Sequence, residues 1–150
     1  MIQAIAHRGP DEKGQFLERG VGRGHARLSI VGLGDGQQPM SLPGRGLTIV
    51  FNGEVFNYIE LRDALKAKGR MFGTGSDTEV ILHLYDELGE DCVSRLNGDF
   101  AFAIWDAPRK RIFFTRDRMG VRPLYYTVAD GTLYFASEVK ALLEAPGGQC

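Results

Sequence analysis

Four dense apolar runs in the second half of the chain constrain its fold more than any other feature. They cover residues 100–105, 112–115, 124–128 and 133–136, and turn-forming residues separate them. Such runs predict successive antiparallel strands. Because the strands are apolar on more than one face, we expect them to be sandwiched between other layers. The predicted class is therefore α+β, with helices packed on sheets.

Before these runs, the sequence predicts one strand that ends in a turn. Residues 47–51 are apolar and rich in β-branched side chains, and Asn52 and Gly53, which follow them, are typical of a tight turn. The first third of the chain is rich in glycine and is expected to contain loops and short strands.

Three helices are predicted from apolar spacing and capping residues. The first covers residues 57–68 with Asn57 at its start, and the second covers residues 76–89, where Ser76 opens a capping box. Ser137 is expected to cap a short third helix that ends near Leu143.

Composition excludes several classes of protein. The 18 Lys and Arg residues against 19 Asp and Glu residues leave a net charge of −1, so nucleic acid and anionic membranes are not expected partners. No apolar stretch approaches the roughly 20 residues that cross a bilayer. Two cysteines, Cys92 and Cys150, are too few for a disulfide framework, and three scattered histidines predict no metal site. One cytoplasmic domain over residues 1–150 is expected.

Familiar phosphate-binding and hydrolase motifs are absent from the sequence. The glycines at 32, 34 and 36 imitate a dinucleotide fingerprint, but the third comes too early and no helix opens after it. ATP chemistry therefore has no recognisable place in this chain.

Polar residues at the ends of apolar segments indicate a specific kind of binding site. These are Arg27, Asn52, Gly53, Glu54 and Asp77. Each alone has an ordinary explanation, such as a surface arginine, a turn, or a carboxylate favoured by a helix dipole. Together they supply what a free amino acid needs: a guanidinium, a carboxylate, and donors for a side-chain carbonyl.

Eight short motifs in register carry a resemblance to the glutaminase domain of glutamine-hydrolysing asparagine synthetases. They are HRGPD (7–11), RLSI (27–30), FNGE (51–54), GSD (75–77), AFAIWD (101–106), RDR (116–118), GVRPLYY (120–126) and ASEVKAL (136–142). The resemblance implies a class II amidotransferase domain of the N-terminal-nucleophile type, which releases ammonia from glutamine in a four-layer αββα sandwich. It also implies that Asn52 and Gly53 form the oxyanion hole.

The resemblance assigns the other pocket residues too. It implies that Arg27 holds the glutamine α-carboxylate and that Asp77, helped by Glu54, holds the α-ammonium. The backbone carbonyl of Val31 is expected to line the pocket.

The sequence departs from the family at the nucleophile, which is an amino-terminal cysteine in its members. Here Met1 is followed by Ile2, and the strand and helix that precede HRGPD in the family are missing. Cys92 reads as a core thiol, and Cys150 has no free α-amine. We therefore expect a domain truncated at its N-terminus and catalytically inactive by itself.

The family's ATP-dependent synthetase domain has no counterpart in these residues, and ATP and magnesium would belong to it. An exposed apolar patch around residues 137–143 is expected where that domain would make contact. A homo-oligomer formed through this patch is an open alternative.

Three questions stay open from sequence. The chain could be an enzyme part with an intact glutamine pocket, or a structural or partner-binding module derived from that domain. An upstream start could restore the cysteine. The ammonia acceptor is also undetermined, although the family favours aspartate.

Overall fold

The computed structural model describes residues 1, 3–4, 12–18, 21–27 and 36–145. Three antiparallel sheets are present in these residues. β1 (Glu12–Glu18) pairs with β2 (Val21–Arg27), and β7 (Tyr125–Ala129) pairs with β8 (Thr132–Ala136). The third sheet has the order β3-β4-β5-β6, formed by β3 (Met40–Leu42), β4 (Leu47–Val55), β5 (Gly98–Asp106) and β6 (Arg111–Arg116).

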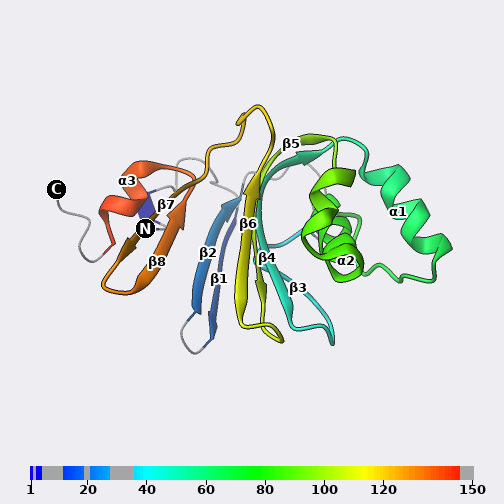
Figure 1. Ribbon diagram of the computed structural model, residues 1–150, viewed down its shortest axis with the longest axis horizontal. Coiled ribbons are helices and arrows are strands. Elements are labelled where there is room, and N and C mark those ends of the chain that lie inside the picture. The colour runs from blue at the N-terminus through cyan, green and yellow to red at the C-terminus, as the bar shows by residue number, and fades with distance from the viewer. Residues whose placement is uncertain (2, 5–11, 19–20, 28–35, 146–150) are drawn as a thin grey trace.

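The helices cover opposite sides of these sheets (Figure 1). α1 (Tyr58–Ala67) and α2 (Asp77–Leu88) lie beyond one face of the four-stranded sheet, and the 3₁₀ helix η2 (Gly89–Arg95) continues α2. The two-stranded sheets lie on its other side, and α3 (Val139–Leu143) packs outside β7 and β8. The order helix, sheet, sheet, helix confirms the expected layered α+β sandwich.

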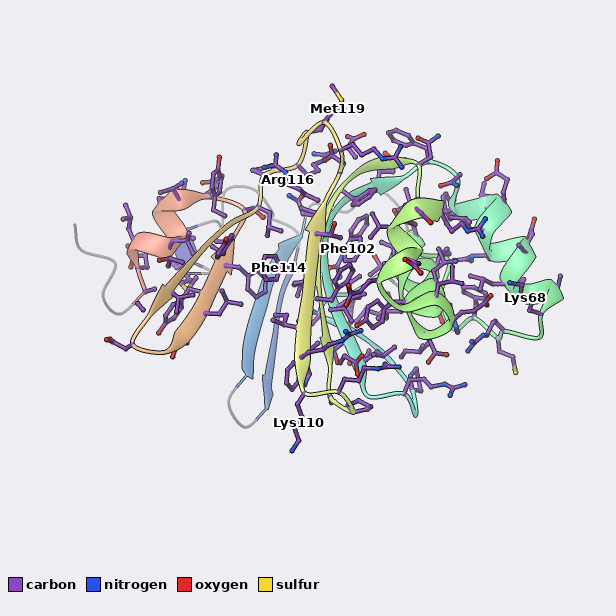
Figure 2. The ribbon with its side chains drawn as sticks, in the orientation of Figure 1. Lys68, Phe102, Lys110, Phe114, Arg116 and Met119 are labelled. Atoms are coloured by element: carbon purple, nitrogen blue, oxygen red, sulfur yellow. The ribbon has the colours of Figure 1, made fainter. Side chains whose placement is uncertain are left out.

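Side chains that alternate along the central strands explain why the four-stranded sheet is buried between layers. Phe102 of β5 lies in the core shared with α2, while Phe114 of β6 stacks on Phe135 at 6.5 Å and contacts Tyr126 at 5.6 Å between ring centroids. Figure 2 shows Phe102 on the side of the helices and Phe114 on the side of β7 and β8. The two apolar faces expected for this sheet are therefore both occupied.

α2 is the most deeply buried helix of the described chain. Its first nine residues, 77–85, are all buried, because the helix lies between the sheet on one side and α1 and η2 on the others. The Ser76 hydroxyl caps it by accepting from the backbone N–H of Thr78 at 3.2 Å. No helix in the described ranges is long and apolar enough to cross a membrane.

Two local predictions were wrong, and a third was right for position only. Asn52 and Gly53 do not end their strand, since β4 continues to Val55 and stays paired with β5. Asn57 is the N-cap residue of α1, as expected, but its side chain bonds to the backbone of residues 95 and 97 and makes no capping bond. α3 begins after Glu138, so Ser137 is not its capping residue.

Candidate functional site

The candidate site lies where the end of β4 meets the start of α2. The Asp77 carboxylate accepts a hydrogen bond from the Val55 backbone N–H at 3.0 Å, which joins the two elements. Asn52, Gly53 and Glu54 immediately precede Val55 on the same strand. The structure therefore brings four of the six predicted site residues into one region.

Asn52 presents a polar group that the described structure leaves unused. Its side-chain nitrogen, Nδ2, is buried and has no hydrogen-bond partner within the described part of the chain. Most buried amide donors in folded proteins are paired, so an orphaned one calls for an explanation. A ligand carbonyl oxygen would supply the missing acceptor.

Gly53 lets β4 pass unusually close to β5. Its φ of 140° is unfavourable for residues with a side chain, and a Cβ there would lie 2.0 Å from the Asp99 carbonyl oxygen. Gly98 allows the reciprocal approach, since its Cβ would lie 2.1 Å from the Glu54 carbonyl oxygen. These two glycines thus allow the close backbone approach that positions Asn52 and Glu54 on β4.

Asp77 is a carboxylate held in a partly dehydrated position. Burial raises its pKa above the usual value, and the backbone N–H groups of Val55 and Thr78 offset this only in part. The nearby charge of Glu54 also raises the Asp77 pKa. Two carboxylates in such an environment favour a bound cation, which would relieve both the repulsion and the lost hydration.

The loop before Asp77 is held by two residues that sequence reasoning did not single out. The Glu79 carboxylate accepts from the backbone N–H groups of Gly73 at 2.8 Å and Thr74 at 2.7 Å. Arg62 of α1 donates to the carbonyl oxygen of Ser76 at 2.9 Å. Glu79 is the last residue of the predicted capping box, three positions after Ser76, but its carboxylate supports the preceding loop instead of the cap.

The other two predicted residues, Arg27 and Val31, belong to the first third of the chain. Arg27 is the last residue of β2, a strand that packs beside β4, so its backbone lies in the second layer. Val31 lies outside the described residues.

Other chemically active side chains lie away from this region in the core. Cys92 is fully buried and belongs to the hydrophobic core, as predicted, and burial raises its pKa to about 12. His83 is buried on α2, where its ring lies 4.5 Å from that of Phe72, and burial lowers its pKa. Among the described residues, no three His, Cys, Asp or Glu side chains form a metal-binding group.

The expected apolar patch near the C-terminal helix is exposed. Val139 and Leu143 of α3 are 51% and 53% accessible. The patch therefore lies on the outer helical layer, at a distance along the fold from the end of β4 (Figure 1).

Comparison with known proteins places the chain in a family. A model of the glutamine amidotransferase domain matches residues 1–150. Asparagine synthetase [glutamine-hydrolyzing] 1 of Bacillus subtilis (strain 168) is 48% identical over 145 residues, which are 97% of this chain and 23% of the relative. Asparagine synthetase [glutamine-hydrolyzing] 3 of the same organism is 46% identical over 148 residues, covering 97% and 24%. The chain thus spans about a quarter of the length of these curated relatives.

A solved structure gives the same result for the fold. The glutamine phosphoribosylpyrophosphate amidotransferase from B. subtilis, complexed with ADP and GMP, aligns with a TM-score of 0.66 and 29% identity. The alignment covers 79% of this chain and 28% of that one. The chain belongs to the glutamine amidotransferase domain family, and it is similar to the corresponding part of glutamine-hydrolysing asparagine synthetases.

Proposed function

We propose that this chain binds glutamine at the end of β4, with the amide oxygen of the ligand facing Asn52 and Gly53. The observation that carries the proposal is the buried Nδ2 donor of Asn52, which has no partner in the described structure and lies on the same β4 segment that Asp77 contacts. In an amide hydrolysis the same donor would face the oxygen that becomes negative. Loss of one such donor costs about a hundredfold or more in rate.

The other end of the ligand is an α-amino acid group, and the site has the charges that would bind it. Asp77, with Glu54 beside it, is proposed to bind the α-ammonium group, since the raised pKa of Asp77 reflects a negative charge in need of compensation. Arg27 at the end of β2 is proposed to bind the α-carboxylate, and the carbonyl of Val31 to line the pocket.

In the whole protein, we infer that the ammonia is used by an ATP-dependent synthetase domain, with aspartate as the favoured acceptor. The similarity to asparagine synthetases that are about four times longer supports this inference. ATP and magnesium would belong to that other domain. Glutamine binding by the present residues is expected to need no cofactor, so chelating divalent metal with EDTA should leave the affinity unchanged.

Neither cysteine of these 150 residues is proposed to be the nucleophile. A nucleophilic cysteine must form a thiolate, and a pKa of about 12 in the core keeps Cys92 protonated. Cys150 has its α-amine in the peptide bond to Gln149, so that amine cannot act as a base. The 150-residue polypeptide is therefore expected to bind glutamine without releasing ammonia.

Calorimetric titration with glutamine tests the binding proposal. Asp77→Asn keeps the size of the side chain but removes its charge, and it should weaken glutamine binding by a hundredfold or more, about 3 kcal/mol. Asn52→Ala should weaken the binding of glutamine far more than the binding of norvaline, an amino acid that lacks the side-chain amide. A wild-type chain that binds no glutamine would instead favour a structural module.

A further inference from the structure

Gln38 uses its side chain to extend the edge of the four-stranded sheet. β3 begins at Met40, which pairs with Ile49 of β4, and continuing this antiparallel register by two residues places Gln38 opposite Phe51. At that position the Gln38 side-chain oxygen accepts the backbone N–H of Phe51 at 2.6 Å. The side chain thus makes a contact to β4 ahead of Met40, the first residue of β3.

The other end of the same amide faces α2. Its nitrogen lies 3.5 Å from the Thr78 hydroxyl oxygen, so a single side chain contacts both β4 and the first turn of the helix. Phe51 and Thr78 are both buried, at 4% and 2% exposure, which limits competition from water for these contacts.

The two partners of Gln38 are sequence neighbours of the proposed ligand-binding residues. Phe51 directly precedes Asn52, and Thr78 directly follows Asp77. Asn52 and Asp77 are the residues assigned above to opposite ends of glutamine. Gln38 therefore joins the neighbours of both ligand-binding groups.

We propose that Gln38 is a positioning residue that sets the separation between the Asn52 donor and the Asp77 carboxylate. It thereby selects an amino acid with the side-chain length of glutamine over one that is a methylene shorter. This inference rests on the proposed glutamine site. A displacement of about 1 Å in such a site can cost about a hundredfold, and a rigid support is needed to prevent it.

The test compares the affinities for glutamine and asparagine in the full chain. Gln38→Met has a similar length and loses both polar contacts, whereas Gln38→Glu keeps an oxygen for the Phe51 N–H and can accept from the Thr78 hydroxyl. Calorimetry should show that the glutamine-to-asparagine affinity ratio falls at least tenfold in Gln38→Met. In Gln38→Glu the ratio should stay within about threefold of wild type. A loss of stability alone would lower both affinities together and leave the ratio unchanged.

The outcomes separate the inference from the function on which it rests. If wild type binds glutamine, Asp77→Asn abolishes binding, and Gln38→Met keeps the wild-type ratio, the positioning role is wrong and the proposed function stands. If wild type binds neither amino acid, both are wrong. Should Gln38→Met fail to fold, Thr78→Val removes only the contact to α2. An unchanged ratio in that variant would overturn the inference.

Discussion

At the scale of single residues, Asn52 and Asp77 each carry a polar group whose environment is incomplete without a ligand. Asn52 has a buried donor with no acceptor in the described structure, and Asp77 has a buried charge beside the like charge of Glu54. Folding alone gives no benefit from either arrangement, because both cost desolvation free energy. In the proposed function, an amide oxygen and an ammonium group in the site would recover this cost.

The first prediction concerns the pH dependence of binding. Because the pKa of Asp77 is raised above its usual value of 3.8, its contribution to folding stability is present below that value and lost as pH rises through the raised pKa. Binding has the opposite sign, since a ligand ammonium favours the ionised form. Glutamine affinity should therefore fall as pH drops through the raised pKa, approaching about tenfold per pH unit.

Titrations between pH 8 and pH 4.5 measure this dependence, with Glu54→Gln as the matched variant. Removing the charge of Glu54 removes one cause of the raised pKa, so the midpoint should move to lower pH. An affinity independent of pH in wild type, or a midpoint that rises in Glu54→Gln, would show that Asp77 does not bind the ammonium group.

At the scale of elements, the close crossing of β4 and β5 supports the site. Gly53→Ala places a methyl group against the Asp99 backbone at a positive φ, and we expect it to cost more than about 3 kcal/mol of unfolding free energy. Gly44→Ala is the control, because Gly44 also has a positive φ but its Cβ would meet no atom within 4 Å. Gly44→Ala should lower the free energy of unfolding by only about 1 kcal/mol, measured by urea denaturation. Equal costs would mean that backbone conformation, and not the crossing, requires Gly53.

The opposite end of β5 is held by a buried carboxylate. Asp106 is fully buried and accepts from Tyr85 at 3.2 Å and from the Arg109 side chain at 2.8 Å. Burial by itself would raise the pKa of Asp106, but the hydrogen bonds and charge of Arg109 outweigh it and hold the pKa below its usual value. The resulting stabilisation is present above pH 3.8 and lost as pH falls through the lower folded pKa.

Asp106→Asn removes this charge, and we expect a loss of about 2–4 kcal/mol in thermal or urea unfolding at pH 7. The control is Glu90→Gln, the same chemical change in an exposed ion pair with Arg111, which should cost less than about 1 kcal/mol. If the two variants lose equal stability, Asp106 is no more important than a surface charge.

Most elements of this fold could be predicted from sequence, because their signals are local. Apolar runs identified β5 to β8, and spacing with capping residues identified α1 and α2. The end of β4 could not be predicted, because pairing with β5 overrides the turn preference of Asn52 and Gly53. The role of Gln38 also had no local signal, since its partners are 13 and 40 residues away.

The candidate site was predicted mainly from the order of motifs. Asn52, Gly53, Glu54 and Asp77 were singled out because they follow or begin apolar segments, and the resemblance supplied their roles; the structure places them together at one end of β4. The supporting contacts of Arg62 and Glu79 depend on how the loop before α2 folds back, which no residue spacing reveals.

At the scale of the whole molecule, the layers separate two surfaces with different chemistry. The end of β4 carries buried polar groups, whereas α3 exposes the apolar side chains of Val139 and Leu143 on the far layer (Figure 1). An apolar surface of this kind is typical of a contact with another part of a protein. This arrangement is what the proposed function requires, with the ligand site and the surface for a neighbouring domain at different places.

The most direct test of this account follows glutamine labelled with ¹⁵N in its side-chain amide by NMR in the presence of the 150-residue chain. If the chain binds glutamine at Asn52 and has no nucleophile, the labelled amide signal should shift or broaden and keep its total intensity over hours. With Asp77→Asn, the signal should have the position and width of free glutamine. No change of the signal would contradict the glutamine site. The appearance of ¹⁵N-ammonium, unaffected by Cys92→Ser, would show that these residues contain a nucleophile other than Cys92 and contradict the proposed lack of hydrolysis.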